Sequence, residues 1–287
     1  MPEKSSTSNA EAVGRLYDRF AAESRDLWPD EAEVPNFGFG EHLHFGYWET
    51  PDEDAPLDVA AMRLTDMVID RLRVDEAHHV LDVGCGIGGP ALRTARRTGA
   101  RVTGITVSES QIEQAKALAQ DADLAGRLDF RLADALNMPF RDGSFDAVFA
   151  LESMMHMPDR PQVLGEIARV LRPGGRVVLT DFFERAPIPE VHRPFVDLLR
   201  ESSLLSTVRV EDYPSMLRGS GMLFEEIVDI SPHTTRRTFI EMSRPWTEWA
   251  AAHPEVGLGT ALAAGIPAPG LIDVEELGYL LLVAQRP

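Results

Sequence analysis

The chain has 287 residues, of which 44% are hydrophobic and 26% charged, and its formal net charge is −18 at pH 7. That length suits one enlarged α/β domain, or a core domain with a smaller cap. The acidic balance argues against a nucleic-acid partner, because such partners need clustered Lys and Arg to neutralise phosphates. Cys85 is the single cysteine, which excludes an intrachain disulfide and fits a reducing cytoplasm.

No window of the sequence comes close to the roughly 18 uninterrupted apolar residues of a membrane span. The first twenty residues also lack the apolar stretch of a signal peptide. We therefore expect a cytoplasmic protein in which residues 1–8 are a polar tail and residues 1–55 form a lid or cap segment.

Strand and helix patterns alternate between residues 56 and 186, which is typical of a parallel sheet with crossover helices. Five strands are expected in this part, at residues 78–84, 101–106, 128–134, 145–151 and 175–183. Helices are expected at residues 58–73, 90–98, 108–122 and 159–171, and Ser108 is the expected N-cap of the third. Two further strands are expected at residues 223–231 and 277–287.

Two mainly helical stretches interrupt this alternation, at residues 187–222 and 234–265. In open α/β sheets, ligands bind beyond the carboxyl ends of the strands, where such stretches can cover a pocket. We expect residues 56–186 and 223–287 to form a ligand-binding core. The two insertions are then a helical substrate cap.

A glycine-rich turn, VLDVGCGIGG at residues 80–89, follows the first strand. Gly84, Gly86 and Gly89 match G-x-G-x-x-G, a pattern that lets backbone approach a ligand closely at the start of a helix. Both a dinucleotide and an adenosyl ligand can use such a turn. The second strand ends in Thr106, where a dinucleotide fold usually has an acid for the ribose hydroxyls, so the dinucleotide hypothesis loses support.

Three further stretches follow in order: ADALNMPF at 133–140, FDAVFALESMMHMPD at 145–159 and EIARVLRPGGRVVLTDF at 166–182. Together with VLDVGCGIGG they resemble the class I methyltransferases that depend on S-adenosylmethionine (SAM). HLHFGYWE at 42–49, with GITVSESQ and ALESMMHMPD, resembles the natural-product tailoring branch that includes the rebeccamycin sugar O-methyltransferase. The resemblance implies a Rossmann-like α/β fold of seven strands with the last one antiparallel. It also implies SAM as cofactor and S-adenosylhomocysteine (SAH) as product.

The resemblance implies which residues hold the methionine part of SAM. The turn at Gly84 and Gly86 would face it, with Asp82 organising the ammonium group. Leu151 and Glu152, after the fourth strand, would lie beside the methionine chain.

The ribose and adenine positions are implied in the same way. Thr106 and Gln111 would contact the ribose, and Asp134 and the amide of Ala135 would contact the adenine. An exposed helix position is the alternative for Gln111, and a loop-capping role is the alternative for Asp134. Tyr47 and Trp48 would close the pocket from the N-terminal side, unless they simply pack in the core.

Methyl transfer to a hydroxyl requires positioning and removal of the hydroxyl proton. His156 follows the fourth strand and Asp181 ends the fifth, so they are expected at neighbouring strand ends. Histidine accepts protons near neutral pH, and a carboxylate beside it can fix its tautomer. We predict His156 and Asp181 as a catalytic base pair. The rebeccamycin-type relatives have a histidine pair here, whereas this chain has Met155, so substrate contact and packing stay as alternatives for His156.

Apolar side chains in the cap segments, including Trp246 and Trp249, favour a bulky apolar acceptor such as a polyketide, macrolide or glycoside. The leading hypothesis is O-methylation in natural-product or antibiotic biosynthesis. C-methylation of an isoprenoid or ring carbon, a repurposed SAM-bound cyclase, and a binding module are the alternatives. No histidines show metal-ligand spacing, so no metal is expected, and a homodimer is left open.

Overall fold

The computed structural model describes residues 8–27, 40–50, 52–122, 124, 126–252 and 269–287. Residues 28–39 of the expected lid and 253–265 of the expected cap lie outside the described residues. The same holds for the side chains of Trp246 and Trp249.

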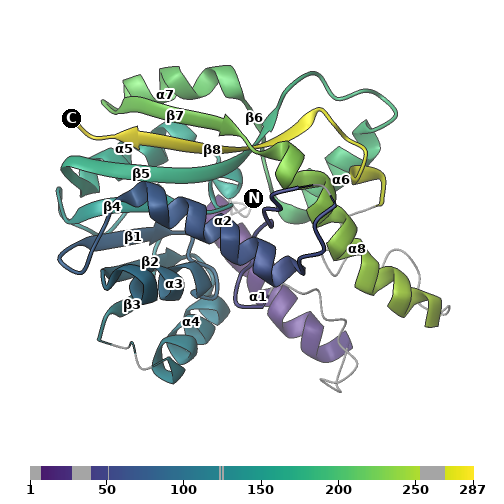
Figure 1. Cartoon of the computed structure of the whole chain (residues 1–287), viewed down its shortest axis with the longest axis horizontal. Helices are drawn as coiled ribbons and strands as arrows, with labels where there is room; N and C mark the ends of the chain where they lie inside the picture. The colour runs from purple at the N-terminus through teal and green to yellow at the C-terminus, as the bar shows by residue number, and fades with distance from the viewer. Residues whose placement is uncertain (1–7, 28–39, 51, 123, 125, 253–268) are drawn as a thin grey trace, which may run out of the picture.

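One mixed sheet forms the centre of the molecule (Figure 1). Its strands are β1 His79–Val83, β2 Arg101–Thr106, β3 Leu128–Leu132, β4 Phe145–Ala150, β5 Leu171–Glu184, β6 Val208–Arg209, β7 Leu223–Asp229 and β8 Leu277–Gln285. They lie in the order β3-β2-β1-β4-β5-β8-β7, and β6 pairs with the end of β5. β1 to β5 are parallel, and β8 is antiparallel to both of its neighbours. This confirms the predicted Rossmann-like sheet and adds the short β6, which the sequence did not predict.

Helices cover both faces of this sheet. They are α1 Asn9–Leu27, α2 Leu57–Leu72, α3 Gly89–Thr98, α4 Glu109–Asp121, α5 Arg160–Val170, α6 Arg193–Ser203, α7 Tyr213–Gly219 and α8 Thr235–Ala252. Figure 1 shows α2, α3 and α4 on one face and α5 and α7 on the other, while α1, α6 and α8 lie beyond the ends of the parallel strands. Short 3-10 turns are η2 Met154–His156, η3 Val210–Asp212, η4 Ser231–His233 and η5 Pro269–Leu271. Among the described residues, no helix is long and apolar enough to cross a membrane.

The central strands are continuous apolar runs because helices bury both of their faces. Successive side chains of a strand point to opposite faces. Along β5, Val178 and Phe182 accordingly join the cluster beneath α2 and α3, whereas Val177 and Leu179 join the cluster beneath α5 and α7. Because of this alternation, neighbouring residues of β5 face opposite layers, and only one of the two sets can reach the site.

The helix starts follow local sequence signals. The Ser108 hydroxyl oxygen accepts a hydrogen bond from the Gln111 N–H at 3.2 Å, which confirms the predicted N-cap of α4.

Within the stretch 187–222, α7 buries Tyr213 and Leu217 in the cluster beneath α5. Helix α7 therefore belongs to a layer of the core, because its apolar residues pack in the cluster on the sheet, whereas α6 of the same stretch lies beyond the strand ends.

Candidate active site

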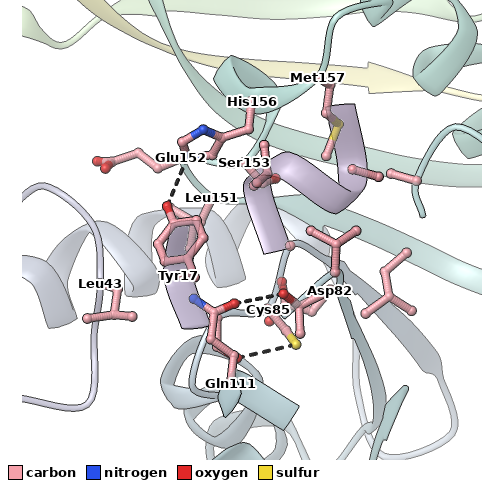
Figure 2. A pocket seen from close by; sticks show the side chains of 18 of the residues that line it. Tyr17, Leu43, Asp82, Cys85, Gln111, Leu151, Glu152, Ser153, His156 and Met157 are labelled. Carbon is pink, nitrogen blue, oxygen red and sulfur yellow. Dashed lines mark hydrogen bonds between the residues drawn. The ribbon is translucent and has the colours of Figure 1, made fainter. Parts of the chain in front are cut away.

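A pocket lies where the loops after β1, β2, β3 and β4 meet α1 and the segment 41–44 (Figure 2). Its volume is about 960 Å³ when the open mouth is counted. The predicted site residues that line it are Asp82, Gly84, Gly86, Thr106, Gln111, Asp134, Ala135, Leu151, Glu152 and His156.

The turn after β1 shapes one end of the pocket. Gly84 has a φ of 80°, and a Cβ at this position would lie 2.3 Å from the Cβ of Ser153. Asp82, the fourth residue of β1, is 1% exposed, and its Oδ2 has no hydrogen-bond partner within the described part of the chain. Burial raises the pKa of Asp82 well above its usual range. Such a carboxyl favours a ligand that brings a positive charge.

The other end of the pocket gathers the residues expected at ribose and adenine. The Thr106 hydroxyl donates to Gln111 Oε1 at 2.7 Å, and both side chains are buried. Asp134 Oδ1 accepts from the Leu136 N–H at 2.9 Å, so this side chain does cap its loop while it lines the pocket. A loop cap and a ligand contact are therefore compatible at Asp134, because its carboxyl has two oxygens.

The pocket is acidic. Four carboxyl side chains line it, and the described lining residues include no Lys or Arg; the four are Glu41, Asp82, Asp134 and Glu152. Carboxylates repel phosphates, so this wall does not favour a dinucleotide, and it suits a cationic ligand. No group of three His, Cys, Asp or Glu is placed to hold a metal ion in the described ranges.

Glu152 stands at the turn after β4 with a φ of 48°, which is uncommon for a residue with a side chain. Its Oε1 accepts from the Phe45 N–H at 2.5 Å and from the Tyr279 hydroxyl at 2.7 Å. The same hydroxyl lies 2.7 Å from Thr180 Oγ1. Burial raises the pKa of Glu152 to about 8, although both hydrogen bonds act in the opposite direction.

Helix α1 contributes side chains to the pocket. The Tyr17 hydroxyl lies 2.8 Å from His156 Nε2 (Figure 2). The Asn9 side-chain amide donates to the His156 carbonyl at 2.7 Å. Burial, followed by the charge of Glu152, raises the pKa of Tyr17 above its usual range. Burial lowers the pKa of His156 to about 4, so this imidazole is neutral at physiological pH.

The sequence predicts a lid or cap segment at residues 1–55, but it does not predict which residues α1 contacts. Asp18 Oδ1 accepts from the Ser108 hydroxyl at 2.6 Å, which ties α1 to the start of α4. The available signal was local, because Val13, Leu16 and Tyr17 follow the spacing of one helix face. That spacing predicts a helix but not the loop against which the helix packs.

The structure does not form the predicted pair of His156 and Asp181, and that prediction is wrong. Asp181 Oδ2 instead contacts Arg160 Nε at 2.7 Å and accepts from the Tyr213 hydroxyl at 2.5 Å. The alternation along β5 explains this, because Thr180 points toward the Glu152 side and Asp181 toward the face of α5 and α7.

Asp181 acts on the pocket only through other residues. Arg160 and Asp181 are 4% and 0% exposed, and burial raises the pKa of Asp181 despite the adjacent guanidinium. Arg160 also donates to the Ser206 carbonyl at 2.7 Å, and the Ser206 N–H donates to the Met155 carbonyl at 2.8 Å. The ion pair thus holds the η2 turn that carries His156.

Tyr47 and Trp48 do not close the pocket from the N-terminal side, so that prediction is wrong and the alternative of core packing holds. Trp48 is 1% exposed and donates its indole N–H to the Ala55 carbonyl at 2.9 Å, while the Tyr47 ring stacks on His233 at 5.0 Å. Both aromatics therefore pack in the core. Within the described residues, Leu43 and His44 line the pocket from this segment instead.

Comparison with known proteins identifies the family. A family model described as a methyltransferase domain matches residues 81–179. Methyltransferase GfsG of Streptomyces halstedii is 36% identical over 284 residues, covering 97% of this chain and 99% of the relative. The 27-O-demethylrifamycin SV methyltransferase of Amycolatopsis mediterranei (strain S699) is 38% identical over 293 residues, covering 96% and 97%. The chain belongs to the SAM-dependent methyltransferases.

A solved structure shares the fold over the whole chain. The crystal structure of the [4+2]-cyclase SpnF superposes with a TM-score of 0.76 at 32% identity, covering 97% of this chain and 96% of that one. The acidic pocket fits the cofactor of the family, since SAM carries a sulfonium and an ammonium group and the buried Asp82 lacks a cationic partner.

We expect the affinity for SAM to rise with pH. Because burial raises the pKa of Glu152 to about 8, the ligand-free protein carries a proton there below about pH 8, and cationic SAM displaces it. Each proton released adds about tenfold in affinity per pH unit, up to the Glu152 pKa of about 8. Isothermal titration calorimetry from about pH 6 to pH 8, in two buffers of different ionisation enthalpy, measures both the slope and the protons. An affinity independent of pH contradicts this expectation.

Proposed function

We propose that the protein transfers a methyl group from SAM to a hydroxyl of a bulky, largely apolar natural product. The observation that carries this is the acidic pocket at the strand ends, with Asp82 buried and lacking a cationic partner among the described residues. The relatives support it, because the Amycolatopsis relative is named for O-demethylrifamycin as its acceptor and aligns along nearly the whole chain.

The side chains in the pocket divide the work. Bound SAM supplies a methyl group on a positively charged sulfur, which makes the methyl carbon electrophilic. Asp82 would hold the ammonium end, while Thr106 and Gln111 would hold the ribose hydroxyls. Tyr17 and His156 would form the wall next to the acceptor and help to exclude water.

The rest of the lining favours an apolar acceptor. Aliphatic side chains contribute most of the remaining wall, among them Val13, Leu43, Ile87, Leu136 and Met157. An apolar pocket with few polar groups binds ligands through buried area and uses the polar groups to orient them. A hydroxyl carried on a large apolar skeleton meets both requirements.

The function is tested by incubating the protein with SAM and a panel of hydroxylated polyketides, macrolides and glycosides. We expect one acceptor to gain a single methyl group, with one SAH formed per product. NMR of the product then shows whether oxygen or carbon carries the methyl group. No methylated product with any acceptor, while SAM binds, contradicts the proposal.

A second candidate is a cyclisation without methyl transfer, which the likeness to the SpnF cyclase favours. Its signature in the same assay is an isomer of the substrate with no SAH formed. C-methylation of an isoprenoid diphosphate has less support. A diphosphate needs cationic partners, and Arg209, Arg236 and Arg237 are each paired with an acidic residue outside the pocket.

A further inference from the structure

We infer that Glu152 is the catalytic base, which takes the proton from the acceptor hydroxyl during the transfer. This inference rests on the proposed O-methylation and names the residue that performs its proton step. It replaces the predicted His156–Asp181 pair, whose carboxylate is bound to Arg160 on the other side of the sheet.

The geometry fixes Glu152 at the pocket. The residue lines it from the turn after β4, where its φ is 48°. The Phe45 N–H and the Tyr279 hydroxyl both bond Oε1. The described part of the chain thus leaves Oε2 to a ligand or to solvent. In Figure 2, Glu152 lies near Tyr17 and His156.

The neighbouring histidine is a weaker candidate for this role. His156 Nε2 is already engaged by the Tyr17 hydroxyl, and burial lowers the His156 pKa to about 4. A general base works best when its pKa lies near the working pH. Glu152, with a pKa raised to about 8, meets this condition far better.

The groups that face Glu152 keep it free of a fixed counter-charge. They come from every element packed around it, namely Tyr279 of β8, Thr180 of β5, Tyr17 of α1, Asp82 of β1 and His44 of the segment before α2. Asp181, on the other face of β5, acts on Glu152 only through its charge. None of them is cationic at neutral pH. The positive charge of bound SAM therefore favours the carboxylate form, which is the form that accepts a proton.

The proposed transfer couples formation of the oxygen–methyl bond to loss of the hydroxyl proton. The acceptor oxygen forms a bond to the methyl carbon while the carbon–sulfur bond breaks and its electron pair stays on sulfur. The hydroxyl O–H bond breaks, its electron pair stays on the oxygen, and the proton moves to Oε2 of Glu152. The protonated carboxyl then returns the proton to solvent after the products leave.

The first test is Glu152→Gln, which keeps an oxygen to accept from Phe45 and Tyr279. We expect kcat for the acceptor found in the panel to fall by about 100-fold or more, with SAH affinity changed far less. In the wild type, kcat/KM for SAM, which reports the ligand-free enzyme, should rise about tenfold per pH unit below about 8, and this limb should be absent from the variant. Glu226→Gln on β7, which loses only a surface ion pair with Arg71, is the matched control with unchanged kinetics.

A second variant and a second readout separate a catalytic role from a structural one. Tyr279→Phe removes a hydrogen bond that lowers the Glu152 pKa, so it should move the limb to higher pH and keep measurable turnover. Infrared difference spectra of the ligand-free wild type against Glu152→Gln should show one carboxyl that titrates near pH 8.

Three results overturn the inference: wild-type kcat in Glu152→Gln, an unchanged pH limb in that variant, or a Glu152 carboxyl that titrates at its ordinary value. Failure of the proposed function gives a different result. The wild type then forms no methylated product and no SAH at any pH, so the reaction itself is absent.

Discussion

Replacing Asp181 by asparagine is expected to lower the free energy of unfolding by about 3–5 kcal/mol. The substitution removes the charge that faces the Arg160 guanidinium, and both side chains are almost completely buried. A buried guanidinium without its carboxylate carries an uncompensated desolvation cost, because the surrounding protein shields it from water. Urea unfolding followed by tryptophan fluorescence measures the loss.

Asp129→Asn is the matched control. Asp129 pairs with Arg131 on β3, and both side chains are about half exposed, so its loss should cost less than about 1 kcal/mol. Since Asp181 faces away from the pocket, SAH affinity of the folded variant should change little. Equal stability of the two variants, or a selective loss of SAH binding in Asp181→Asn, contradicts the structural role of the ion pair.

Most of the fold was predictable because it rests on local patterns. Continuous apolar runs such as FDAVFAL can be read as buried strands, and Ser108 before a helical stretch can be read as an N-cap. The glycine turn and the residues after β2, β3 and β4 converge because the carboxyl ends of parallel strands meet at one edge of a sheet. The set of lining residues from Asp82 to Glu152 follows from that single geometric rule.

The predictions that are wrong or missing concern residues whose positions are set by contacts between distant segments. Placing Asp181 requires knowing which face of β5 it occupies, and a shift of one residue moves a side chain to the other face. A motif predicts Trp48 at the pocket, yet the Ala55 carbonyl and the apolar residues of α2 hold it in the core. Tyr17 meets His156 across 139 positions of sequence, and no local pattern encodes that distance.

The state of the Glu152 carboxyl is another feature that the local sequence does not encode. A motif places it beside the methionine chain, whereas its protonation depends on Phe45, Tyr279 and the lack of a cation among the described lining residues. These features come from three separate parts of the chain. The burial that their assembly produces raises the pKa of this carboxyl to about 8, against the opposite effect of the two hydrogen bonds.

Gly84→Ala is expected to abolish SAM and SAH binding at ordinary ligand concentrations. A φ of 80° costs a residue with a Cβ about 1–2 kcal/mol, and the new methyl group would lie 2.3 Å from the Cβ of Ser153. Ser153 cannot retreat without losing the 2.5 Å hydrogen bond from its hydroxyl to the Val83 carbonyl. A total cost of about 3 kcal/mol corresponds to more than about 100-fold in affinity. Calorimetry with SAH measures it.

Gly174→Ala separates backbone strain from damage to the pocket. Gly174 has a φ of 81°, nearly that of Gly84, but a Cβ there would meet no atom within 4 Å and the residue lies far from the pocket in the turn before the buried part of β5. This control should lose about 1–2 kcal/mol of stability and keep its SAH affinity. If both variants bind SAH like the wild type, the turn after β1 does not hold the cofactor. If only Gly84→Ala loses binding, the close approach of Gly84 to Ser153 is what shapes the methionine end of the site.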